Sequence, residues 1–147
     1  MKHSRNTRRF GSAASFQRGV TLIELLVVMV IVGILAAIAY PSYQRYVART
    51  HRNAAAACLS QIAQSLERRY TTNLTYVGAD INPGCETEND LQRFYTITIP
   101  EASLRQSEYV VQAEPTAVQN RAEGQQCGTL SLNHTGTRRS NNNNTCW

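Results

Sequence analysis

The sequence predicts an α+β fold, in which one long N-terminal helix packs on a small antiparallel β-sheet. The first observation is an apolar stretch from Val20 to Tyr40 that leads directly into a second stretch of helical periodicity. The second observation is a set of three short runs, later in the chain, with the character of β-strands. Because these runs follow a single long helix, an antiparallel meander packed on that helix is the most economical architecture.

Residues 1–19 are polar and basic and have no apolar period, which predicts a disordered leader that is later removed. The leader carries five of the 15 Lys and Arg residues and no acidic residue. The rest of the chain has ten basic and ten acidic side chains, so the formal net charge of +5 comes from the leader. By the positive-inside rule, this charge holds the amino terminus in the cytoplasm and sends the rest of the chain across the membrane. The five basic residues are Lys2, Arg5, Arg8, Arg9 and Arg18.

Residues 20–41 predict a membrane-spanning helix. The 21 residues from Val20 to Tyr40 contain one acidic side chain, Glu24, and no Lys or Arg. As a helix they would span about 31 Å, close to the thickness of a bilayer's hydrocarbon core. A carboxylate there costs roughly 2.5 kcal/mol or more, so it requires a partner cation. The only cation at that depth would be the α-amino group created by a cut between Gly19 and Val20.

Two other interpretations account for less of this stretch. A secretory signal also has a basic start and a small-residue site, and residues 37–39 supply one. Its apolar core, however, is about 7 to 15 residues long. A plain membrane anchor explains the helix but neither Glu24 nor Gly19.

Residues 42–70 predict that the helix continues into a globular part, which comprises residues 42–147. Apolar side chains recur there at spacings of three and four, and the alanines at 54–57 favour helix strongly. We expect a bend at Pro41, whose ring removes one backbone hydrogen bond. The stripe expected to pack on the sheet consists of Leu59, Ile62, Ala63, Leu66 and Tyr70.

The remaining chain predicts a loop, three strands and a polar tail. Residues 71–92 read as a long loop because Gly, Pro and Asn recur in them. Strands are expected at residues 94–99, 108–113 and 128–133, and the first two end at prolines. The polar link at 116–126 could hold a short helical turn, although the sequence does not decide its form, and the Asn-rich tail at 134–147 would hold no shape unaided.

The four cysteines would lie outside the cytoplasm, where disulfides persist. They are Cys58, Cys85, Cys127 and Cys146, which allow three pairings, and the sequence does not choose among them. A bond from Cys127 to Cys146 would close the polar tail and stabilise the fold by about 3 kcal/mol in the chain-entropy model. Cys58 and Cys85 would then tie the helix to the loop that follows it.

The residues around the predicted cut resemble the class III signal of type IV pilins and pseudopilins. The match consists of a basic leader ending in Gly19, then Thr21 and Glu24, and further along Gly33 and Pro41. The resemblance implies the pilin fold, cleavage after Gly19 by a prepilin peptidase and methylation of the new amino terminus at Val20. It also implies that Glu24 forms a salt bridge between subunits. Many pilins begin with Phe, so Val20 favours a minor subunit.

The carboxyl-terminal end resembles that of PilE-type minor pilins, through residues 127–133, Gly136 and the closing Cys146 and Trp147. In pilins the disulfide-bounded region is exposed and mediates contacts. The resemblance therefore makes Arg138 and Arg139 candidates for a binding patch. Two arginines are a weak electrostatic signal, and a solvated loop is the simpler interpretation.

The sequence indicates neither an enzyme nor a cofactor or metal site, since the histidines and cysteines lack ligand spacing and the catalytic motifs are missing. We expect a structural minor subunit of a type IV pilus that serves adhesion, twitching motility or DNA uptake. The alternatives are a type II secretion pseudopilin and a DNA-binding competence pilin.

The expected partners are other pilin subunits, the prepilin peptidase and the pilus assembly machinery of the inner membrane, with DNA less favoured. The expected location is the bacterial inner membrane, among its lipids and with a cytoplasmic amino terminus, and after assembly the surface pilus.

Overall fold

The computed structural model describes residues 19–79, 84–123, 126–141 and 146–147. The chain forms two compact units, one that ends at Ala37 and one that begins at Ile38. Residues 1–18 of the predicted leader lie outside the described residues. The expected bend at Pro41 stays a prediction.

Helix α1 (Leu22–Asn73) contains both helical stretches and continues through Pro41. It begins after Thr21, whose Oγ1 accepts a hydrogen bond from the Glu24 backbone N–H at 3.3 Å, as an N-cap residue does. It ends at Asn73, and the next residue, Leu74, adopts φ 54° while its N–H donates to the Tyr70 carbonyl at 2.8 Å. The loop predicted from residue 71 therefore starts three residues too early.

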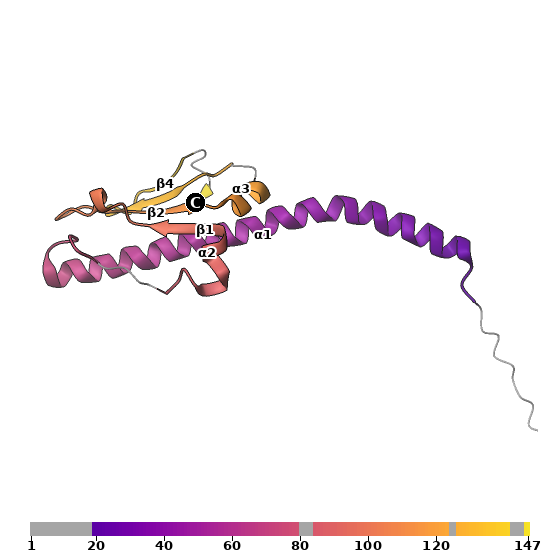
Figure 1. Cartoon of the computed structure of the whole chain (residues 1–147), viewed down its shortest axis with the longest axis horizontal. Helices are drawn as coiled ribbons and strands as arrows, with labels where there is room; N and C mark the ends of the chain where they lie inside the picture. Colours follow the sequence, from indigo (N-terminus) through magenta and orange to yellow (C-terminus); the bar gives the residue numbers. More distant parts are fainter. Residues whose placement is uncertain (1–18, 80–83, 124–125, 142–145) are drawn as a thin grey trace, which may run out of the picture. The chain divides into compact units, whose positions relative to one another are not determined.

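The predicted antiparallel meander is confirmed, with four strands in place of three. The strands β1 (Tyr95–Thr98), β2 (Val110–Pro115), β3 (Leu130–Asn133) and β4 (Arg138–Ser140) form one sheet in chain order. All neighbouring pairs are antiparallel. Figure 1 shows this sheet lying along the carboxyl-terminal half of α1.

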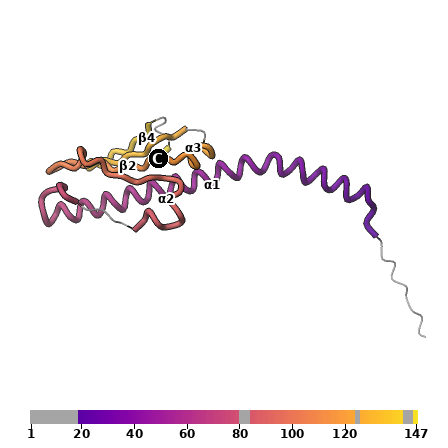
Figure 2. The backbone as a smooth tube through the Cα atoms, viewed as in Figure 1, coloured from indigo at the N-terminus to yellow at the C-terminus, as the bar shows by residue number. Residues whose placement is uncertain are grey.

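The core of the second unit is formed by residues of α1 and the sheet, whose backbones run side by side in Figure 2. Of the predicted stripe, three side chains are buried and the two others pack against the core from its margin. The sheet contributes alternate residues, as expected for strands with one covered face. The buried hydrophobic residues of the stripe and the sheet are Leu59, Ile62, Leu66, Tyr95, Val111, Ala113, Leu130 and Leu132.

The strand limits differ from the predicted ones for local reasons. Phe94 is not in the first strand, because it closes the short helix α2 (Leu91–Phe94). The second strand lies two residues later than predicted and includes Pro115, which occupies its last position, where a proline is tolerated. The third starts at Leu130, because Gly128 has φ +62° and turns the chain.

Three further elements were not predicted. The open link contains helix α3 (Ala117–Glu123), and the predicted loop contains the 3-10 helix η1 (Glu88–Asp90). A second 3-10 helix, η2 (Glu101–Ser103), joins β1 to β2. The tail also holds more structure than its composition predicts, since β4 pairs along β3.

Candidate functional site

The start of α1 carries the three residues of the predicted processing and assembly site. Gly19 and Val20 precede the helix, are exposed, and place the bond between them outside regular structure. A Cβ added at Gly19 would meet no atom within 4 Å. Glu24 lies in the first turn of α1 and is also exposed. The bond predicted to be cut is therefore accessible, and the cut itself stays a prediction.

The apolar surface of the first unit is uncovered within this chain. Among the described residues, α1 is the one helix that is long and apolar enough to cross a membrane by length and composition. Its N-terminal side chains are largely exposed, for example Leu22 at 81 % and Met29 at 75 %. Such a surface needs lipid or other apolar helices around it.

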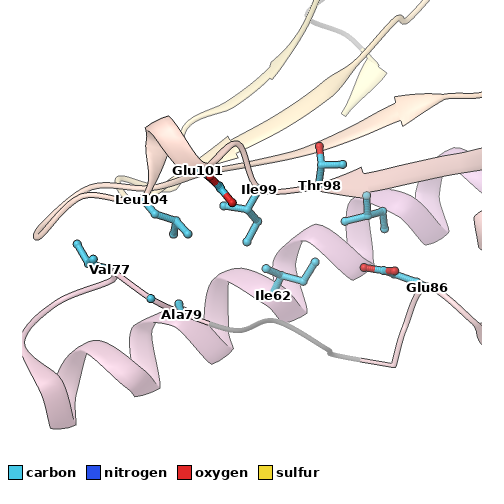
Figure 3. Close-up of a pocket in the computed structure, with 10 residues that line it drawn as sticks. Ile62, Val77, Ala79, Glu86, Thr98, Ile99, Glu101 and Leu104 are labelled. Carbon is cyan, nitrogen blue, oxygen red and sulfur yellow. The ribbon is translucent and has the colours of Figure 1, made fainter.

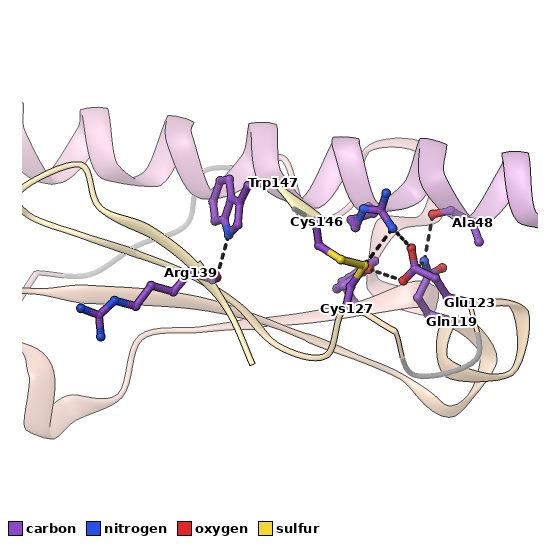
Figure 4. Close-up of a disulfide and its surroundings, with 9 residues drawn as sticks. Ala48, Gln119, Glu123, Cys127, Arg139, Cys146 and Trp147 are labelled. Carbon is purple, nitrogen blue, oxygen red and sulfur yellow. Dashed lines mark hydrogen bonds and ion pairs between the residues drawn. A yellow bond between two sulfur atoms is a disulfide. The ribbon is translucent and has the colours of Figure 1, made fainter. Parts of the chain in front are cut away.

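Two disulfides organise the second unit. Cys58 in α1 is bonded to Cys85, and Cys127 is bonded to Cys146, with Cα atoms 5.6 Å apart in each pair. The second bond closes the C-terminal loop, as expected, and it brings Trp147 against β4. There the indole Nε1–H donates to the Arg139 carbonyl at 2.7 Å (Figure 4).

The candidate arginines occupy the edge of the sheet. Arg138 pairs with Leu132 and Arg139 with Ser131, and both arginine side chains are exposed. Because successive side chains of a strand alternate, Arg138 lies on the same face as buried Leu132, and Arg139 lies on the opposite face. The Arg138 guanidinium stacks over the Trp147 ring at 5.4 Å. The two cations therefore flank the β4 edge.

A network of polar contacts that the sequence did not reveal joins α3 to α1. Arg52 forms an ion pair with Glu123, and its Nη1 also lies 3.0 Å from the Cys127 sulfur. Gln119, which is fully buried, donates from Nε2 to the Ala48 carbonyl at 2.9 Å and to Glu123 at 3.2 Å (Figure 4). Its two acceptors fix the orientation of the amide. The sequence did not predict this network, because the link that contains α3 has no apolar period.

A cavity of about 500 Å³ lies between α1 and the end of β1, and its lining mixes the apolar side chains of Ile62, Ile99 and Leu104 with the carboxylates of Glu86 and Glu101 (Figure 3). The described residues that line this cavity form no cluster of catalytic groups. Within the described parts of the chain, no group of three or more His, Cys, Asp or Glu could hold a metal ion.

Two family models match the chain. The model described as "Type IV minor pilin ComP, DNA uptake sequence receptor" matches residues 41–131. The model described as "Prokaryotic N-terminal methylation motif" matches residues 15–40. The first therefore covers α1 from Pro41 through the second residue of β3, and the second covers the predicted cut and the apolar stretch.

Similar proteins are fimbrial subunits and pilins. The chain is 27% identical to a fimbrial protein of Neisseria meningitidis serogroup B over 123 residues, which are 84% of this chain and 71% of that protein. It is 64% identical to the type IV major fimbrial protein FimA of Dichelobacter nodosus, over 36 residues that are 24% of this chain and 23% of FimA. Among solved structures, a type IV pilin from Shewanella oneidensis is 30% identical, with a TM-score of 0.49, over 68% of this chain and 97% of that one.

Proposed function

This chain belongs to the type IV pilin family and has a ComP-like minor pilin domain, and we propose that it binds DNA outside the cell for uptake. Its family is structural and non-enzymatic. From the sequence alone we expect a general structural subunit first and a DNA-binding pilin second. The family match favours the reverse order, because its description names a DNA uptake sequence receptor.

The observation that carries the proposal is the pair of exposed arginines at the β4 edge. Arginine is the side chain best suited to bidentate contact with phosphate, and each phosphate contact releases counterions from DNA. Arg138 and Arg139 flank one strand edge, so a DNA backbone that runs along this edge can contact both. The disulfide from Cys127 to Cys146 and the Trp147 hydrogen bond hold that edge in place. The family match ends at Ser131, before these arginines, so their role rests on this geometry.

Assembly into a surface filament would expose the β4 edge outside the cell, where it could meet DNA. We propose that the leader is removed after Gly19 by a prepilin peptidase and that Val20 is methylated. The mature subunit then resides in the inner membrane with its amino terminus in the cytoplasm. Other pilin subunits and the assembly machinery next incorporate it into a surface filament, with Glu24 as the counter-ion of a neighbouring amino terminus. The match to the N-terminal methylation motif supports this sequence of events.

The test is binding of duplex DNA to the full mature chain in detergent, measured across a range of salt concentrations. Substituting both Arg138→Ala and Arg139→Ala should weaken binding to every sequence and lower the salt slope by about two. The matched control, Arg93→Ala with Arg121→Ala, removes the same charge from α2 and α3 and should leave the slope unchanged. If the wild-type chain binds no DNA, or if the control weakens binding equally, the proposal is wrong.

A deletion strain provides the cellular test. Loss of the gene should lower DNA uptake while filaments and the secretion of exoproteins continue. Lost secretion with normal DNA uptake would indicate the pseudopilin alternative, and lost filaments would indicate a general structural subunit.

A further inference from the structure

Exposed tyrosines and arginines gather in the turns of α1 at the end of the apolar stretch. The tyrosines are Tyr40, Tyr43 and Tyr46, and all three are exposed. The arginines are Arg45 and Arg49, which are also exposed. Tyrosines are enriched where a membrane-spanning helix leaves the hydrocarbon core, because the side chain has an apolar body and a polar tip. This segment therefore has the composition of a helix that crosses a membrane surface.

The two arginines share one face of α1. They are four residues apart, so they lie about one turn from each other. Helical side chains lean toward the amino-terminal end of the helix, and the Arg45 Nε–H does so when it donates to the Pro41 carbonyl at 3.3 Å. At 1.5 Å per residue, Arg45 lies about 7.5 Å beyond Tyr40 and Arg49 about 13.5 Å. The headgroup layer is about 5 to 8 Å thick on each side of a bilayer, so both long side chains can reach it.

The positive charge on this face is not balanced by acidic side chains. The sequence has no Asp or Glu at residues 25–66. In the described parts of the chain, neither Arg45 nor Arg49 belongs to an ion pair. Glu123, the acidic residue of α3, is already paired with Arg52. The two arginines therefore present a net positive charge to whatever covers this face.

Membrane topology does not explain these charges. By the positive-inside rule, arginines near the end of a membrane-spanning helix favour the cytoplasmic side. Arg45 and Arg49 follow the apolar stretch, so they lie at the end that is expected to be translocated. The five basic residues of the leader outweigh them before the cut and are then removed with it. Two charges that oppose the orientation and remain on the mature subunit need another role.

We propose that Arg45 and Arg49 bind the phosphate of anionic phospholipid headgroups, in the leaflet that faces away from the cytoplasm. The guanidinium group suits phosphate because its N–H groups form paired, charge-assisted hydrogen bonds. Tyr43 and Tyr46 lie beside the arginines at the level of the lipid glycerol. These contacts fix the depth of the helix until the subunit is assembled. The inference rests on the membrane stage of the proposed function and extends it to a lipid class and its binding residues.

The experiment uses the full mature chain in phosphatidylcholine vesicles with and without phosphatidylglycerol. Electron paramagnetic resonance of spin-labelled lipids gives an association constant for each lipid, and the ratio of the two constants measures the preference for the anionic headgroup. The wild-type chain should prefer phosphatidylglycerol, and salt should weaken this preference. Arg45→Gln with Arg49→Gln should lower the ratio by about 5-fold for each arginine removed. Arg45→Lys with Arg49→Lys keeps both charges and should retain most of the preference.

The matched control is Arg68→Gln with Arg105→Gln, which removes two exposed positive charges from the same unit. Arg68 lies about 28 Å further along α1 than Arg49 at 1.5 Å per residue, so the control should leave the lipid ratio unchanged. Glutamine is a good helix former, so the substitutions at exposed positions of α1 should not unfold it.

The outcomes separate this proposal from the proposed function. A wild-type ratio near one, a ratio that the Arg45 and Arg49 substitutions leave unchanged, or an equal fall in the control would each overturn the lipid assignment. If the wild-type ratio is near one and the glutamine variant instead enters filaments poorly, the face contacts neighbouring subunits and not lipid. A chain that does not float with vesicles of phosphatidylcholine alone would overturn the membrane stage as well. DNA binding is tested separately, through Arg138 and Arg139.

Discussion

At the scale of single residues, three tyrosine hydroxyls converge on two carboxylates. Tyr76 and Tyr109 donate to Glu67, and Tyr95 donates to Glu123 at 3.4 Å. Burial is the main reason why the pKa of each of these tyrosines is raised, and the neighbouring carboxylate adds to the effect. The pKa of Tyr76 rises from 10.0 to about 12. The folded state therefore favours the neutral phenols.

These shifts predict how stability responds to alkali. Because the folded pKa of Tyr76 lies above its unfolded value, its contribution is complete below pH 10.0 and is lost as the pH rises toward about 12. Titration by the ultraviolet absorbance of tyrosinate should show that three of the seven tyrosines ionise late or only on unfolding. In the Glu67→Gln variant, Tyr76 should titrate earlier, yet still above its ordinary value, because burial remains. Seven tyrosines that titrate together at the ordinary pKa would contradict this packing.

At the scale of secondary structure elements, the helix α3 is held to α1 by the Arg52–Glu123 ion pair. The two side chains are 15% and 9% exposed, so neither charge is well solvated. The loss of one partner would leave the other buried without compensation, and this costs more than the intact pair contributes. The same guanidinium contacts the Cys127 sulfur, so α1, α3 and the closing disulfide meet at this point.

Glu123→Ala should destabilise the folded unit by about 3 kcal/mol, because Arg52 then stays buried and unpaired. Replacing both residues, as Arg52→Met with Glu123→Leu, should cost clearly less than the single change. Urea unfolding of residues 38–147, which form a compact unit with its own core, gives the free energies. A double variant that is as unstable as the single variant would show that the ion pair is not the relevant contact.

The elements that were predicted correctly are those whose signal is local. The apolar stripe that includes Leu59 and Ile62 repeats at helical spacing, and β3 alternates around Leu130, so each reveals its buried face without knowledge of the rest of the chain. Helix α3 buries Gln119, a polar residue, and therefore shows no such period. Strand β4 depends on pairing with β3 and on a disulfide, and neither is encoded within its own three residues.

At the scale of the whole molecule, the two units have different surfaces. The second unit buries its apolar residues within the chain, whereas the first exposes them. The cut after Gly19 and the counter-ion role of Glu24 stay predictions, and they can be made from the sequence because these residues and Val20 lie within one short segment. Arg52 of α1 and Glu123 of α3, by contrast, come from segments far apart in the sequence, so only the fold brings them together.

The last prediction concerns the role of the Glu24 carboxylate in the assembled filament. Glu24→Ala removes an acidic group from the apolar stretch, so insertion into the membrane should be unharmed or improved. In a filament, however, the new amino group at Val20 would lack its counter-ion among packed apolar helices, and an unpaired buried charge is costly. The variant should therefore remain abundant in the membrane fraction while its amount in sheared filaments falls, as measured by immunoblotting of both fractions. Glu24→Asp keeps the charge on a shorter side chain and should retain part of the incorporation. If the alanine variant enters filaments as well as wild type, the carboxylate is not the partner of the amino terminus, and the membrane cost of Glu24 requires another explanation.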